Sequence, residues 1–246
     1  MKKIFAIFLL GFAMIHGGFL DEQKKYERVK TALKDKNDAI QKSLANAGID
    51  AQKFNVVFIA YKDEAILEIY AKNKDEKLYK PLKQYDILQS SGDLGPKSAQ
   101  GDKQVPEGFY QIERFNPFSN FYLSLGINYP NGADKLRSRA KNLGGDIFIH
   151  GSFVTVGCLP MSDNKIKEIY LYAVFAKNNG QNNIPVYIFP FKMNEKNMSK
   201  FTRKYAENEE LLAFWRNLKD GYDKFFDTKT ELKFSVKKGG LYIFDK

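Results

Sequence analysis

The stretch Ile147–Asp163 reads IFIHGSFVTVGCLPMSD and holds His150 together with the one cysteine of the chain, Cys158. Gly151 follows the histidine and Gly157 precedes the cysteine. A thiolate nucleophile needs a nearby base, an exposed turn and backbone N–H groups that can bind an oxyanion. We interpret the stretch as a buried strand that ends at His150, followed by a loop that doubles back to the cysteine.

In this interpretation Cys158 is the nucleophile, and His150 either removes its proton or forms a thiolate–imidazolium pair with it. The N–H groups of Gly157 and Cys158 are the candidate oxyanion donors, each contributing ~3 kcal/mol by analogy with other acyl-transfer sites. The residues alone leave open that the thiol is a buried, inert side chain. A redox role lacks a resolving cysteine, and no cluster of further ligands indicates a metal site.

The composition favours a folded, exported protein without a nucleic-acid partner. The 246 residues are 43% hydrophobic and 15% aromatic, enough for a packed core. The formal net charge of +10 is spread along the chain without an arginine-rich block or a nucleic-acid motif. This charge would suit an anionic envelope or wall polymer, although a lysine-rich solvated surface is the simpler explanation.

Residues 1–18 have the layout of a signal peptide. Lys2 and Lys3 give a positive start, Ile4–Ile15 is an apolar run, and glycines follow. The run is short for a membrane span, so we expect export to the periplasm or cell envelope. An uncleaved anchor, the alternative, would be the sole contact with a membrane. Cleavage would remove the other histidine and leave His150 alone.

The remaining sequence predicts a mainly β body with flanking helices, an α+β class without successive βαβ units. The pattern gives the following elements: a helix at 23–47, strands at 54–61, 65–71, 78–89, 109–115, 120–125, 146–150 and 185–191, a helix at 164–177, a further helix within 200–226, and a hairpin from 230–236 and 241–244. The long irregular segment 91–108 is of a kind that is often functional. We divide the chain into a signal peptide (1–18), an N-terminal helix (19–50), a catalytic domain (54–191) and a C-terminal helical extension with a possible hairpin (195–246).

Three stretches resemble the L,D-transpeptidase catalytic domain family (YkuD type). His150-Gly151 and Thr155-Val156-Gly157-Cys158 match its H-G and S-x-G-C motifs. Met161-Ser162-Asp163 behind the cysteine, and the short interval between histidine and cysteine, are most similar to the YafK-like subgroup. The segments 101–110 (GDKQVPEGFY) and 214–223 (FWRNLKDGYD) agree with the same family. The likeness runs from about residue 54 to about residue 226.

The resemblance implies a β-sandwich or barrel-like core and a cysteine enzyme without cofactor or metal. Cys158 would attack an amide at the meso-diaminopimelate residue of a peptidoglycan stem peptide. His150, oriented by the carbonyl of Gly151, would act as base and then as acid. The acyl group would pass to an amine or to water. In the YafK-like subgroup the implied activity is hydrolytic release of a lipoprotein attached to the wall.

The sequence departs from the crosslinking members at two positions. Pro160 stands where these enzymes often carry an arginine, and Thr155 replaces serine but keeps the hydroxyl. Loss of a fixed cation that could bind a substrate carboxylate argues against crosslinking. Thr155, Ser152 and Tyr129 are candidate substrate contacts. A catalytically silent wall-binding or scaffolding protein of the envelope is the alternative function, and a thiol redox sensor is a third.

Further residues have structural interpretations. Ser162 or Asp163 would cap the helix after the cysteine. Trp215 is expected in the core, and Asp102 and Glu107 are expected to be ordinary loop charges.

Overall fold

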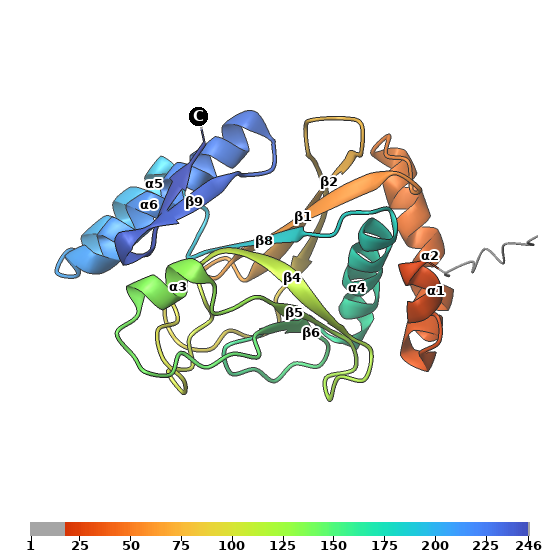
Figure 1. The fold of residues 1–246 in the computed structure, drawn as a ribbon, viewed down its shortest axis with the longest axis horizontal. Helices are drawn as coiled ribbons and strands as arrows, with labels where there is room; N and C mark the ends of the chain where they lie inside the picture. Colours follow the sequence, from red (N-terminus) through yellow and green to blue (C-terminus); the bar gives the residue numbers. More distant parts are fainter. Residues whose placement is uncertain (1–17, 246) are drawn as a thin grey trace, which may run out of the picture.

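The structure is a computed structural model that describes residues 18–245. Its centre is an eight-stranded sheet in the order β3-β2-β1-β8-β4-β5-β6-β7 (Figure 1). Neighbouring strands are antiparallel except for the parallel pairs β1–β8 and β6–β7. The strands are β1 (Phe54–Tyr61), β2 (Ile66–Asn73), β3 (Lys80–Asp86), β4 (Gly108–Asn116), β5 (Ser124–Ile127), β6 (Phe148–His150), β7 (Leu159–Pro160) and β8 (Ile184–Phe189).

Helices cover both faces of this sheet (Figure 1). Strand β1 is almost a continuous apolar run, and its alternate side chains enter two cores, with Phe58 in one and Ile59 in the other. The first core lies under the helices α1 (Phe19–Gln23), α2 (Glu27–Asn46) and α4 (Asp163–Asn178). The second lies under α5 (Glu195–Lys204), α6 (Glu209–Thr228) and the hairpin of β9 (Phe234–Lys237) and β10 (Leu241–Phe244), which a short turn, η1 (Lys238–Gly240), connects. The short helix α3 (Gly132–Arg137) contacts this hairpin.

The predicted α+β class with a mainly β core and flanking helices is confirmed. Strand β1 has the predicted bounds, and the terminal hairpin forms around Gly239 and Gly240. Pro81 lies in β3 at the edge of the sheet, where its missing N–H costs no ladder hydrogen bond.

Two predicted elements were wrong in their bounds, and one helix was not predicted. The strand placed at 120–125 is β5, which begins at Ser124, because Tyr122 adopts a left-handed backbone with φ +71°. The helix placed at 23–47 is α2, which begins at Glu27, and α1 is a separate short helix before it. The helix expected within 200–226 is α6, which the side chain of Asn208 starts by accepting from the N–H of Leu211, and α5 before it was not predicted.

Glu107 corrects another expectation, because its carboxylate is fully buried rather than an ordinary loop charge. Oε1 pairs with Lys62 Nζ at 2.9 Å and accepts from the N–H of Gly95 at 2.6 Å, while Oε2 accepts from Trp215 Nε1 at 2.9 Å. Lys62 also donates to the carbonyls of Gly95 and Val105. This buried ion pair ties the segment 91–108 to β1 and to α6, and Trp215 lies in the core as predicted.

Candidate active site

The parallel pair β6–β7 brings His150 and Cys158 onto one face of the sheet. Ile149 is paired with Leu159 and His150 with Pro160. Ile149 and Leu159 point into the core beneath α4. Because side chains alternate along a strand, His150 and Cys158 both point to the opposite face. The seven residues between them form the loop that the sequence predicted.

The imidazole of His150 is held in one orientation. Its Nδ1 lies 2.5 Å from the carbonyl oxygen of Gly151, and its ring lies against Phe121 with centroids 4.5 Å apart. A carbonyl oxygen only accepts hydrogen bonds, so Nδ1 carries the proton and Nε2 keeps a free lone pair. Burial lowers the pKa of His150, and the bond to Gly151 opposes this effect in part. The neutral, basic form is therefore favoured.

Gly151 is required by close packing. A Cβ atom at this position would lie 2.6 Å from both Asp163 Oδ1 and the carbonyl oxygen of Phe121. Asp163 itself accepts from the N–H of Ser152 at 2.8 Å. The helix cap is supplied by Ser162, the other candidate for it, which accepts from the N–H of Lys165. Asp163 fixes the loop that leaves His150.

The thiol of Cys158 is 9% exposed. Its sulfur accepts from the N–H of Phe148 at 3.3 Å and donates to the carbonyl of Asp146 at 3.5 Å. Burial raises its pKa, and the N–H of Phe148 opposes this effect. Since the pKa of His150 moves down and that of Cys158 moves up, the directions favour a neutral thiol and a neutral imidazole. This favours proton removal during attack over a preformed ion pair.

The two predicted oxyanion donors are both hydrogen-bonded to hydroxyl groups. The N–H of Gly157, whose φ is +86°, donates to Ser91 Oγ at 2.7 Å. The N–H of Cys158 donates to Thr155 Oγ1 at 3.0 Å, and that hydroxyl donates to the carbonyl of Cys158 at 2.7 Å. Thr155 thus lies inside the loop as a bracing group. Ser91 was not anticipated, and the length of its irregular segment was the sole signal for it.

The remaining two candidate substrate contacts have different surroundings. Ser152 adopts a left-handed backbone with φ +63° on the loop after His150. Tyr129 is 4% exposed, and its hydroxyl donates to the carbonyl of Leu143 at 3.1 Å. Its placement is structural, so the expected contribution of Tyr129 to the cleft has no support from its position.

A small cavity of about 200 Å³ is lined by Asp146, Ile147, Lys97 and Lys103, among other residues. Asp146 connects it to the site, because its carbonyl accepts from the thiol of Cys158. The ammonium of Lys97 already has a counter-ion, because it pairs with Asp102 at 2.6 Å. The loop before the cysteine exposes apolar side chains at the surface nearby: Phe153, Val154 and Val156.

Residues 18–245 hold neither a group of metal ligands nor a helix that could span a membrane. Residues 18–245 contain no group of three or more histidine, cysteine, aspartate or glutamate side chains arranged to hold a metal ion. In the same part of the chain, each helix is too short or too polar to cross a bilayer. The predicted signal peptide lies, apart from Gly18, outside the described residues.

Comparison with known proteins identifies the family of the chain. The family model of the L,D-transpeptidase catalytic domain (YkuD) matches residues 55–188, which include His150 and Cys158. The chain belongs to the L,D-transpeptidase family. YafK from Escherichia coli K12, provisionally named an L,D-transpeptidase, is 36% identical over 188 residues, covering 76% of this chain and 72% of YafK; YafK of strain O157:H7 gives the same figures.

Two solved structures resemble the fold of this family member at low sequence identity. One is the helical cell shape determining protein Pgp2 from Campylobacter jejuni, with 19% identity, a TM-score of 0.44 and coverage of 80% of each chain. The other is Bd1075 from Bdellovibrio bacteriovorus, with 20% identity, a TM-score of 0.42 and coverage of 72% of this chain and 64% of that one.

Proposed function

We propose that this L,D-transpeptidase-family protein is an exported cysteine acyl-transfer enzyme that acts on peptidoglycan at the diaminopimelate residue of stem peptides. The observation that carries the proposal is the geometry of the β6–β7 pair. It presents Cys158 on the same face as His150, and the carbonyl of Gly151 keeps the Nε2 lone pair of that histidine free. A base in this state can take the proton of a neutral thiol.

The proposed reaction has two halves. Nε2 of His150 removes the proton from Cys158 Sγ as the sulfur attacks the amide carbon of the substrate. The tetrahedral intermediate collapses when the imidazolium gives that proton to the leaving amine, which departs and leaves a thioester. His150 then deprotonates the incoming water or amine, which attacks the thioester carbonyl. Return of the proton to the sulfur releases the product and restores the thiol.

The oxyanion would be bound by the N–H groups of Gly157 and Cys158. In the resting state both donate to hydroxyls, those of Ser91 and Thr155. Substrate binding would therefore exchange these partners for the developing negative charge. A charged acceptor forms the stronger hydrogen bond, so the exchange favours the intermediate over the resting amide.

We favour water over an amine as the acceptor of the acyl group, which makes the reaction a hydrolysis and not a crosslinking. Pro160 occupies the position where crosslinking members often carry an arginine, and it pairs with His150 in the strand ladder. A proline there offers no cation for the carboxylate of a second stem peptide. The similarity to YafK and its subgroup supports release of a wall-attached lipoprotein as the hydrolytic reaction.

The test is a comparison of the wild-type protein with Cys158→Ala on defined diaminopimelate-containing muropeptides, including crosslinked, tetrapeptide and lipoprotein-linked forms. The masses of the products are measured by mass spectrometry with and without an added amine. We expect products that depend on Cys158 and carry the mass of water. An amine adduct would instead assign transfer. Equal products from both proteins, or none from either, would refute the enzymatic proposal.

A catalytically silent wall-binding protein is the second candidate, and the 9% exposure and raised pKa of Cys158 favour it. It predicts binding to sacculi without labelling of the thiol by a carbapenem at neutral pH. Rapid labelling of the wild-type protein that is lost in His150→Ala would exclude it.

A further inference from the structure

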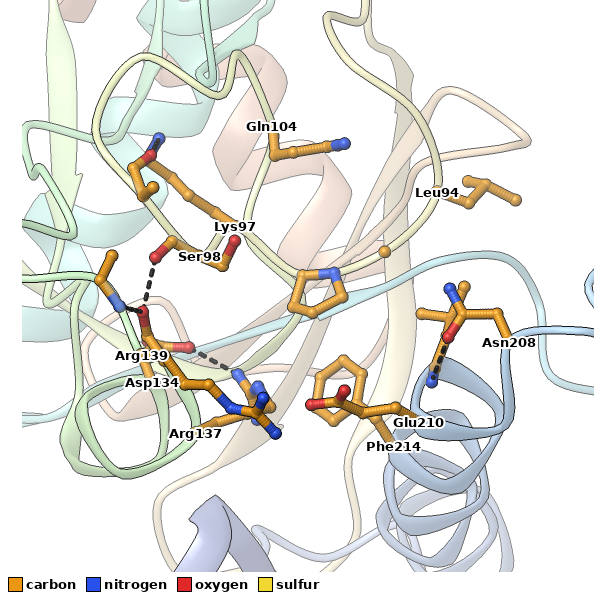
Figure 2. Close-up of a pocket in the computed structure, with 16 residues that line it drawn as sticks. Leu94, Lys97, Ser98, Gln104, Asp134, Arg137, Arg139, Asn208, Glu210 and Phe214 are labelled. Atoms are coloured by element: carbon orange, nitrogen blue, oxygen red, sulfur yellow. Dashed lines mark hydrogen bonds and ion pairs between the residues drawn. The ribbon is translucent and has the colours of Figure 1, made fainter.

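A second cavity, of about 480 Å³, lies between the segment 91–108, the residues after α3 and the start of α6 (Figure 2). Lys97 borders both this cavity and the smaller one lined by Asp146 and Ile147. The apolar part of its wall comes from Leu94, Leu211 and Phe214. A cavity of this volume is of the size that binds small molecules or the end of a peptide.

Two guanidinium groups line one side of this cavity. Arg137 donates from Nη2 to Asp134 at 2.8 Å and lies over the ring of Phe214 at 4.1 Å. Its Nη1 is buried and has no hydrogen-bond partner among the described residues. Arg139 is exposed, and no carboxylate of residues 18–245 lies within 4.0 Å of it. Two such donors lining one cavity are suited to a carboxylate.

A carboxylate stands on the other side of the cavity. Figure 2 shows Glu210, on the first turn of α6, facing the side of the cavity that carries Arg137 and Arg139. Glu210 is exposed and is not part of an ion pair within the described residues. The cavity therefore holds charges of opposite sign that do not neutralise each other. A ligand with an ammonium and a carboxylate on one carbon would satisfy both.

We propose that this cavity binds the free α-amino-acid end of a peptide, with Arg137 and Arg139 holding its carboxylate and Glu210 its ammonium. The proposal rests on the proposed function, because the side chain of diaminopimelate carries such an end. It adds a subsite for the substrate that is separate from Cys158 and lies on the other side of Lys97.

The experiment measures binding of the synthetic tripeptide L-alanyl-γ-D-glutamyl-meso-diaminopimelate to the full chain by isothermal titration calorimetry. Two altered tripeptides have the side-chain amine acetylated or the carboxylate of the same carbon amidated. We expect each alteration to weaken binding about tenfold, the effect of one hydrogen bond to a charged group. Arg139→Gln should reduce the sensitivity to amidation, because Arg137 remains, and Glu210→Gln should abolish the sensitivity to acetylation.

Matched controls remove the same charges outside the cavity. Lys135→Gln and Glu207→Gln alter exposed residues that do not line it, and both should retain both sensitivities. The proposal is overturned if the three tripeptides bind equally, or if Arg139→Gln and Glu210→Gln behave like the controls. The tripeptide ends at diaminopimelate and offers no bond beyond it. A negative result in this binding experiment can therefore be told apart from a failure of the proposed enzymatic function, which would appear as a lack of products that depend on Cys158.

Discussion

Replacing Glu107 by glutamine tests how the active-site segment is held. The change keeps the shape of the side chain and removes its charge, so the ammonium of Lys62, 3% exposed, loses its counter-ion. Breaking a buried pair at one partner costs about 3–5 kcal/mol. Lys62 retains the carbonyls of Gly95 and Val105 as acceptors. Both carboxylate oxygens of Glu107 accept from N–H groups, so the NH2 of glutamine would face the donor of Trp215 or those of Gly95 and Lys62. We therefore expect a loss of about 3–5 kcal/mol in the free energy of unfolding.

The measurement is urea unfolding followed by circular dichroism, with the slope of the transition checked for two-state behaviour. Glu113→Gln is the matched control, because Glu113 is 43% exposed and its contact with Arg114 is 3.6 Å long. That variant should change stability by less than about 0.5 kcal/mol. Lys62→Met combined with Glu107→Gln should recover part of the loss. A single Glu107→Gln variant within about 1 kcal/mol of wild type would contradict the role given to this pair.

Four further outcomes are expected at the loop between His150 and Cys158 and at Ser91, which bonds to it. Gly151→Ala should destabilise the protein by about 1–3 kcal/mol by overpacking, seen in the same unfolding assay, and should lower turnover because the carbonyl that orients His150 is displaced. Since the pKa of His150 is lowered, its base form persists to lower pH, so kcat/KM should fall on acidification only below the ordinary histidine value of 6.5. Alkylation of Cys158 by iodoacetamide should rise with pH through a midpoint above 9.0, because its pKa is raised; a midpoint below that value would indicate an ion pair instead. Ser91→Ala should free the N–H of Gly157 and speed carbapenem acylation by roughly two- to tenfold, whereas slower acylation would mean that the hydroxyl positions the amide.

Local patterns in the sequence were sufficient for much of the architecture. The run of apolar residues in β1 identifies a strand buried on both faces, and the serine before α4 identifies the start of a helix. The sequence did not separate α5 from α6, because Tyr205 continues the apolar spacing while the backbone leaves the helix there. Its ring packs against Trp215, so tertiary contact determines where the helix ends.

The candidate site also contains residues that the sequence predicted and residues that it did not. His150 and Cys158 were predicted because both chemistry-bearing side chains lie in one short stretch. Ser91 was not, because its contact with Gly157 spans 66 positions along the chain. The burial of Glu107 was missed for a similar reason, since its partners Lys62 and Trp215 lie on distant elements. Contacts between distant segments leave no periodic pattern in a single sequence.

The hydrogen-bonded pairing of β6 with β7 has a consequence for variation in this family. The backbone ladder positions His150 relative to Cys158, the proposed base and nucleophile. Thr155 braces the cysteine and the N–H of Ser152 bonds to Asp163. The side chains of Phe153, Val154 and Val156 can therefore be exchanged while the proposed reacting pair stays in place. Evolution, or an engineer, can alter what this segment presents to a partner, here the exposed Phe153 and Val156, without rebuilding the chemistry beneath it.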